Sequence, residues 1–130
     1  MEVTDTRPRG LHRLYRALGH SYRGLRHAVL NDTAVREGLL AAAILVPLSI
    51  LLPVSDLEHL LLVLSMMLVV LVELLNSAIE ATVDRISLER HPLAGLAKDL
   101  ASAAVLVAVL MSGLCWVVIG GPVVVRWVQS

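Results

Sequence analysis

Three carboxylates and an amide interrupt a strongly apolar stretch in the middle of this 130-residue chain. They are Glu73, Asn76, Glu80 and Asp84. At about 100° per helical residue, the four side chains fall within a sector of roughly 80°, so they form one stripe on one helix face. Ionisable groups are costly at membrane depth and by default mark a functional site. This acidic stripe is therefore the best clue to function.

The depth of each carboxylate decides which chemistry it suits. Shallow carboxylates can hold a divalent cation, since Mg²⁺ takes one or two carboxylates together with substrate phosphates. A deeper carboxylate is better suited to accepting a proton, because burial disfavours its charged form. The expected order is Asp84 and Glu80 near the membrane boundary and Glu73 deepest. Lys98, expected beside the same boundary, suits a phosphate.

Composition assigns the chain to one class. Of its residues, 57% are hydrophobic and only 3% aromatic, and the apolar runs are too long for a soluble fold of this size. These runs are continuous rather than alternating, which argues against a β-barrel. We therefore expect one all-α polytopic membrane domain over residues 1–130. Neither a GxxxxGKS/T loop nor a GxGxxG run occurs, so any nucleotide has to bind on the helices, and nothing indicates a nucleic acid partner.

Basic residues are concentrated before the first apolar run. Seven arginines lie there, at positions 7, 9, 13, 16, 23, 26 and 36, whereas residues 53–58 carry only acidic charges. Arg85, Arg90 and Lys98 follow the second apolar run. By the positive-inside tendency, the N-terminus and the second loop are cytoplasmic, and the first loop and the C-terminus lie outside. Three membrane crossings satisfy this pattern.

Four helices are expected to position these groups. Residues 11–30 place apolar side chains at helical spacing with arginines between them, which is typical of an amphipathic helix on the membrane surface. Membrane helices are expected at 34–52, 57–86 and 97–119. Asp32 or Thr33 can cap the first of them. Residues 120–122, Gly-Gly-Pro, are expected to end the last helix, and Trp127 beyond it is typical of an interfacial anchor.

Several segments resemble a known family. Residues 72–86, with His91, 97–99 and 102–106 downstream, resemble the signature of the prokaryotic diacylglycerol kinases. Residues 19–26 and 31–36 resemble the surface helix of that family and the entry to its first membrane helix. The resemblance implies a lipid kinase of the bacterial cytoplasmic (inner) membrane that uses ATP and Mg²⁺ to phosphorylate diacylglycerol to phosphatidic acid. It also implies a homotrimer with active sites shared between subunits.

The same resemblance implies roles for individual residues. Glu73 matches the catalytic base, and Asn76 matches a residue that orients the reacting groups. Asp32 and Glu80 match the metal ligands. The residues that match the ATP site are Arg13, His20, Asp32, Glu80, Glu89, Arg90, His91, Lys98 and Asp99. Those that match the lipid site are Ala17, Ser21, Tyr22, Arg26, Val35, Glu73 and Ser102.

The chain departs from the family pattern at a few positions. Asp32 is one methylene shorter than the expected glutamate, which bears on its distance to a metal. Gly38 stands where a glutamate is frequent, with Glu37 one place earlier. His20 replaces an aromatic residue and Tyr22 a frequent tryptophan. None of these changes touches Glu73, Asn76, Glu80 or Lys98, so we expect an active enzyme whose metal affinity is the property most altered.

Two other functions compete with this interpretation. Related small kinases phosphorylate undecaprenol with much the same polar stripe, and lipid identity depends on groove shape. The second alternative is a small oligomeric channel or proton-coupled transporter, in which Glu73 and Glu80 would line a pore. The clustering of carboxylates toward one side of the membrane, with Lys98 beside them, argues against a pore.

Overall fold

The computed structural model describes residues 10–86 and 88–130, which form four α-helices. These are α1 (Leu11–Asn31), α2 (Thr33–Leu51), α3 (Asp56–Ile86) and α4 (Pro92–Gln129). The last three are long and apolar enough to cross a membrane, and α1 is amphipathic. The expected all-α architecture, with three membrane helices and one surface helix, is confirmed.

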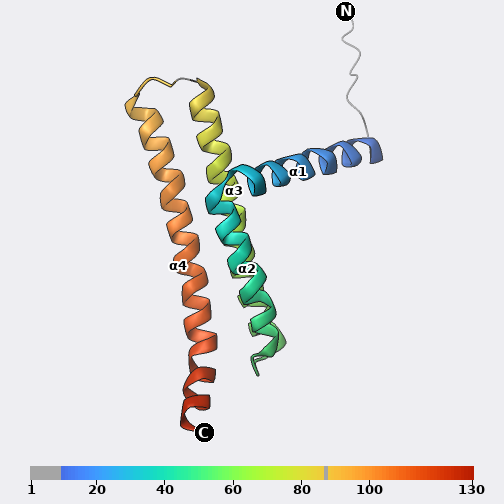
Figure 1. Ribbon diagram of the computed structural model, residues 1–130, viewed down its shortest axis with the longest axis vertical. Coiled ribbons are helices and arrows are strands. Elements are labelled where there is room, and N and C mark those ends of the chain that lie inside the picture. Colours follow the sequence, from blue (N-terminus) through green and yellow to red (C-terminus); the bar gives the residue numbers. More distant parts are fainter. Residues whose placement is uncertain (1–9, 87) are drawn as a thin grey trace, which may run out of the picture.

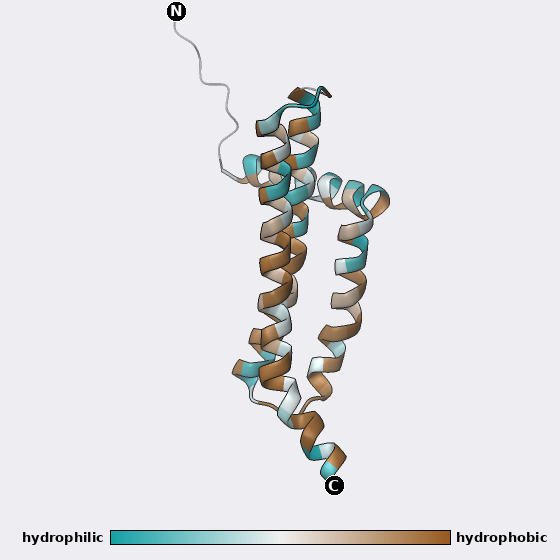
Figure 2. Ribbon diagram, turned by 90° about the vertical axis from the view of Figure 1, so that its left-hand side faces the viewer, coloured by the Kyte–Doolittle hydropathy of each residue, from teal (hydrophilic) through white to brown (hydrophobic). Residues whose placement is uncertain are grey.

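Helix α3 is the centre of the arrangement. It runs antiparallel to both α2 and α4 and packs against each of them (Figure 1). Helix α1 leaves the start of α2 sideways, across the direction of the other three helices (Figure 1). Hydrophobic residues fill the middle of the long helices, and hydrophilic residues concentrate where α3 passes into α4 (Figure 2). We call this the loop end of the molecule (residues 84–92) and the opposite end, at residues 52–55, the turn end.

Asp32 separates the surface helix from the first membrane helix. Its backbone is extended (φ −110°, ψ 115°), and its Oδ1 accepts a hydrogen bond from the Val35 N–H at 3.2 Å. An aspartate oxygen in this position satisfies one of the amides that have no partner within the helix. Of the two expected caps, Asp32 rather than Thr33 therefore starts α2.

A compact cluster holds the turn end together. Ser55 and Glu58 form a capping box, in which the Ser55 Oγ accepts from the Glu58 N–H at 3.3 Å and Glu58 Oε2 accepts from the Ser55 N–H at 2.8 Å. Below it, Leu52 and Leu62 are buried against Ile119 and Val123. The turn between α2 and α3 is therefore fixed onto the C-terminal part of α4.

Helix α4 is longer at both ends than the expected range of 97–119. It begins at Pro92 because proline is well suited to the first helical position and His91 Nδ1 accepts from the Leu93 N–H at 3.2 Å. It continues to Gln129 through Gly120, Gly121 and Pro122, so the expected stop is wrong. Glycine and proline are tolerated within membrane helices, and burial of Val123 against the turn end holds the helix beyond them.

Candidate functional site

A contact between Asp32 and Ser77 sets the depth of the acidic stripe. The Ser77 hydroxyl donates to Asp32 Oδ2, which places Ser77 level with the first residue of α2. Glu73 lies one turn of α3 further into the bundle, about 6 Å along the axis, and Glu80 lies about 4.5 Å on the other side of Ser77. The stripe is therefore graded along α3, with Glu73 deepest and Asp84 nearest the loop end.

Asp32 is held in its charged form by its surroundings. The Ser77 hydroxyl contributes most, and the amides of Val35 and Ala34 and the positive charge of Arg36 add to it, so the pKa of Asp32 lies below its usual range despite partial burial. Each carboxylate oxygen has two lone pairs, and the Val35 and Ser77 hydrogen bonds use one on each. Asp32 therefore keeps the capacity to bind a cation.

A cavity of about 730 Å³ lies between the second half of α1 and the loop-end half of α3. We call it the α1–α3 cavity. Its lining includes both expected metal ligands, Asp32 and Glu80, together with Asp84. Its α1 wall is formed by Ser21, Gly24, Leu25, His27, Ala28 and Asn31. The two expected metal ligands thus line one space, Asp32 from the junction of α1 and α2 and Glu80 from α3.

The donor set in this cavity fits Mg²⁺ bound with a substrate. No group of three or more histidine, cysteine or acidic side chains converges on one point among the described residues. Mg²⁺ seldom needs such a cage, because one or two carboxylates, waters and substrate phosphates complete its shell. Asp32 and Glu80 are suited to that partial role, which depends on a phosphate being present.

Asn76 lies against Glu80 on the same helix face. Its Nδ2 donates to Glu80 Oε1 at 3.4 Å. Its Oδ1 is buried and has no hydrogen-bond partner among the described residues. A buried polar atom without a partner is costly, so the Asn76 carbonyl is an unsatisfied acceptor beside Glu80 on the acidic stripe.

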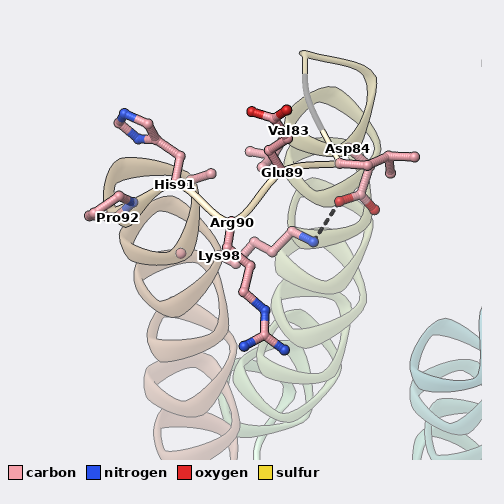
Figure 3. Close-up of a pocket in the computed structure, with 10 residues that line it drawn as sticks. Val83, Asp84, Glu89, Arg90, His91, Pro92 and Lys98 are labelled. Atoms are coloured by element: carbon pink, nitrogen blue, oxygen red, sulfur yellow. Dashed lines mark hydrogen bonds and ion pairs between the residues drawn. The ribbon is translucent and has the colours of Figure 1, made fainter.

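A second cavity, of about 470 Å³, opens at the loop end between α3 and α4. We call it the loop-end cavity. Lys98 reaches across it from α4, with its Nζ 2.6 Å from Asp84 Oδ1 (Figure 3). Glu89, Arg90 and His91 line the same space. Four of the expected ATP residues are therefore brought together, and Asp84 belongs to the lining of both this cavity and the α1–α3 cavity.

Glu73 faces a different environment from the rest of the stripe. It lines a groove of about 500 Å³ between α2, α3 and α4, whose walls are mainly apolar. Glu37 and Gly38 lie on the α2 side, and Trp116 lies deeper, with its indole Nε1 buried and without a partner among the described residues. The deepest carboxylate therefore borders space suited to hydrocarbon, whereas the shallower ones border the polar cavities.

Other predicted residues are not gathered into these cavities by one chain. Arg13 and Ala17 lie in the first half of α1, which points away from α3 and α4 (Figure 1). His20, Tyr22 and Arg26 are exposed on the same helix, and Asp99 and Ser102 are exposed on α4. Val35, predicted to touch lipid, is instead completely buried, because the first turn of α2 packs inward there.

Several residues in these cavities escaped prediction. Ser77 lies inside the stripe segment, but its role as partner of Asp32 depends on how α2 packs against α3. His27 and Asn31 enter the α1–α3 cavity only because α1 folds over α3. The position of His27 one turn before Asn31, close to Asp32 in sequence, was the one available signal. No sequence signal indicated a role for Trp116, since tryptophan is common in membrane helices.

Known proteins similar to this chain identify its family. The family model described as prokaryotic diacylglycerol kinase matches residues 19–120. The chain belongs to this family. The diacylglycerol kinase of Escherichia coli (strain K12) is 44% identical over 110 residues, which are 85% of this chain and 90% of that protein. The diacylglycerol kinase of Pseudomonas aeruginosa is 46% identical over 110 residues, 85% of this chain and 89% of the relative.

A third relative extends the comparison. The diacylglycerol kinase of Haemophilus influenzae is 44% identical over 107 residues, 82% of this chain and 91% of the relative. The match to the family model covers the second half of α1, α2, α3 and most of α4, so it contains every cavity described above. As a prokaryotic diacylglycerol kinase family member with three membrane-length helices, the chain is a membrane protein.

Proposed function

We propose that this protein transfers the terminal phosphate of ATP to the free hydroxyl of diacylglycerol, producing phosphatidic acid and ADP. One observation carries the proposal: the acidic stripe changes its surroundings with depth. Glu73 borders an apolar groove, whereas Glu80 and Asp84 border polar cavities at the loop end. A lipid hydroxyl and a water-soluble nucleotide can therefore approach the same helix face from opposite directions.

The loop-end cavity is suited to the nucleotide. Lys98 and Arg90 supply positive charge for phosphate oxygens, and Glu89 and His91 are further polar side chains in the same lining. Asp99, the next residue after Lys98, is exposed on α4 outside this lining. Lys98 Nζ lies 2.6 Å from Asp84 Oδ1. Because both side chains are exposed to solvent, this contact is weak enough to be exchanged for a phosphate.

The groove is suited to the lipid. Its walls are apolar along α2, α3 and α4, and Glu73 lies on the loop-end side of it. An acylglycerol lying along these walls would present its hydroxyl at the level of Glu73. The Glu73 carboxylate then accepts the hydroxyl proton as the lipid oxygen forms a bond to the terminal phosphorus. The bond between that phosphorus and the bridging oxygen of ADP breaks at the same time.

The remaining groups align the reactants and balance charge. Asn76 lies between Glu73 and Glu80 along α3, and its Oδ1 has no partner among the described residues, which supports a role in orienting a reacting group. Asp32 and Glu80 would hold Mg²⁺, which supplies neutralisation of the phosphate oxygens when bound. Phosphoryl transfer depends mainly on positioning and electrostatics, so these few side chains suffice without a separate nucleotide domain.

We further propose a homotrimer with shared sites. Support comes from the position of Arg13 in the half of α1 that points away from α3 and α4 of its own chain (Figure 1). Contact between Arg13 and a nucleotide held by Lys98 would then need a neighbouring copy. The large exposed apolar surface of α2 and α4 leaves room for such neighbours as well as for lipid.

We place the loop end on the cytoplasmic side of the bacterial inner membrane. The arginines of α1 and the loop-end residues Arg85, Arg90 and Lys98 support this orientation by the positive-inside tendency, since the turn end carries Asp56 and Glu58 instead. The C-terminus would then lie outside. This orientation presents the phosphate-binding side chains to cytoplasmic ATP.

A direct phosphorylation assay tests the proposed function. The purified protein is incubated in mixed micelles with γ-labelled ATP and Mg²⁺, with diacylglycerol in one reaction and undecaprenol in another. Label is expected in phosphatidic acid, and its formation is expected to stop when Mg²⁺ is removed. Label in the polyprenol alone would assign the chain to the other lipid, and label in neither lipid would contradict kinase activity.

A further inference from the structure

His27 occupies a position in the α1–α3 cavity that the proposed reaction has not used. It lies on α1, one turn before Asn31, and contributes to the cavity wall opposite Glu80 and Asp84 of α3. Its side chain is exposed rather than packed in a core. The imidazole of His27 is therefore in a position to form a hydrogen bond with a ligand bound beside the expected metal ligands.

The hydrogen bonds of Asn31 indicate which nitrogen of this ring is an acceptor. Asn31 Nδ2 lies 2.9 Å from the backbone carbonyl of His27, and a carbonyl can only accept, so the amide group facing it must be the NH₂. The same nitrogen lies 3.3 Å from His27 Nδ1. A donor can pair there only with an acceptor, so Nδ1 is unprotonated. The neutral ring therefore carries its proton on Nε2.

The Nε2–H of His27 differs from the other polar groups that line the cavity. The carboxylates of Asp32, Glu80 and Asp84 are acceptors. The Ser77 hydroxyl is used by Asp32, and the Ser21 hydroxyl donates to the Ala17 carbonyl at 3.0 Å. The Asn31 NH₂ is used by His27 itself. Among the described side chains that line the cavity, the Nε2–H of His27 is the donor without a partner.

We propose that His27 donates this hydrogen from Nε2 to a phosphate oxygen bound in the α1–α3 cavity. The inference rests on the proposed function, which brings phosphate to Asp32 and Glu80. A phosphate in this cavity would otherwise meet carboxylates on the α3 wall, which repel it wherever no cation intervenes. A neutral N–H donor on the opposite wall stabilises an oxygen of the phosphate that faces away from the α3 carboxylates.

His27 acts here as a positioning residue in the binding of a phosphate, which can come from two sources. The nucleotide brings its phosphates with Mg²⁺, and the product phosphatidic acid carries the transferred group. Both offer the same anionic oxygen to Nε2–H. The test therefore measures two affinities, one for Mg²⁺ with β,γ-methylene-ATP and one for phosphatidic acid as a product inhibitor.

Three substitutions separate the proposed contact from a structural role. In His27→Gln the side-chain amide nitrogen reaches the position of Nε2, whereas in His27→Asn it reaches only that of Nδ1. His27→Phe keeps the ring shape and removes both nitrogens. We expect His27→Phe and His27→Asn to weaken binding of the phosphate ligand about tenfold or more, as for loss of a hydrogen bond to a charged group. His27→Gln should recover most of the affinity.

The matched control is His12→Phe, in the first turn of the same helix and outside the α1–α3 cavity. It should leave both affinities unchanged. If the His27 variants lower only the affinity for magnesium β,γ-methylene-ATP, ATP is the source of the phosphate. If they lower only the affinity for phosphatidic acid, the product is the source. The proposal is overturned if His27→Phe changes neither affinity. It is also overturned if His27→Asn recovers binding and His27→Gln does not, because that pattern indicates a purely structural bond to Asn31.

Failure of the proposed function would give a different result. A wild-type protein that binds the magnesium nucleotide but labels no lipid contradicts the kinase assignment while the His27 variants still report on the phosphate contact. A wild-type protein that binds neither phosphate ligand overturns both. Far-ultraviolet circular dichroism and the Tm of each variant show whether an affinity change reflects loss of fold.

Discussion

Asp32 combines two roles that a single substitution can separate. It caps α2 through the Val35 amide and faces the α1–α3 cavity as an expected metal ligand. Its depressed pKa keeps it charged under the conditions in which Mg²⁺ binds. Its side chain is one methylene shorter than the glutamate that the family resemblance implies at this position. The hydrogen bond from the Ser77 hydroxyl connects this shorter side chain to α3.

Asp32→Asn should weaken Mg²⁺ binding while keeping the helix cap. Asparagine caps helices as well as aspartate does, so the Tm should change little, whereas Asp32→Ala should cost about 1 kcal/mol of stability. The neutral amide is a poor ligand for Mg²⁺ compared with a carboxylate, and the Mg²⁺ concentration for half-maximal activity should rise at least several-fold. Titrating activity with Mg²⁺ at saturating ATP measures this. An unchanged half-maximal concentration would remove Asp32 from the metal site.

At this scale, the residue types were predictable and their partners were not. The spacing of Glu73, Asn76, Glu80 and Asp84 placed them on one helix face, and the structure keeps them there. The partner of Asp84, however, is Lys98, fourteen positions away, rather than a neighbouring arginine. Such pairings depend on how α3 and α4 pack, which periodicity along one helix does not encode.

Among the elements, the helices themselves follow closely from hydropathy, and their ends follow less well. Capping residues fixed the starts of α2 and α3, because Asp32 and Ser55 satisfy local amides. The Gly-Gly-Pro segment at residues 120–122 was expected to end α4, but the helix continues to Gln129. Packing of Val123 against Leu52 and Leu62 stabilises the helix beyond that segment, and this contact joins residues far apart in sequence.

Leu62→Ala should destabilise the protein without changing its substrate affinities. Leu62 is completely buried between α3 and α4 at the turn end, far along α3 from the acidic stripe. Removing its side chain leaves a cavity whose loss of packing costs about 2 kcal/mol or more. Thermal or denaturant unfolding in micelles measures the effect, with KM for ATP as the check on the site.

Leu64→Ala provides the control on the same helix. Leu64 is 50% exposed, against 0% for Leu62. Its truncation should affect stability much less than that of Leu62. Equal loss in the two variants would contradict the packing described at the turn end.

For the whole molecule, one chain leaves the predicted site incomplete. Lys98 and the acidic stripe come from α3 and α4, whereas Arg13 is carried away from them on α1 (Figure 1). The fold class and the number of membrane helices were accessible from composition and charge. The proposed homotrimer comes from the family resemblance alone, because relations between copies depend on complementary surfaces rather than on local patterns.

Mixed oligomers test whether the sites are shared. Arg13→Met and Lys98→Met chains should each be strongly impaired alone and should recover part of the activity when reassembled together. If Arg13 and Lys98 contribute to one site from different chains, some sites in a mixed oligomer contain neither substitution. If both came from one chain, every site would keep one lesion, and mixing would restore nothing. Lipid phosphorylation after denaturation and joint reconstitution measures the outcome.

The central claim is that acidic groups on α3 are divided by depth between proton transfer and nucleotide binding. Glu73→Gln tests it most directly, with labelled phosphate transfer to diacylglycerol and binding of magnesium β,γ-methylene-ATP measured on the same preparation. Glu58→Gln, at the other end of α3, is the control, since glutamine is compatible with the capping box. We predict that Glu73→Gln lowers turnover about 100-fold or more while nucleotide affinity stays at the wild-type value. Normal turnover in Glu73→Gln would contradict the account.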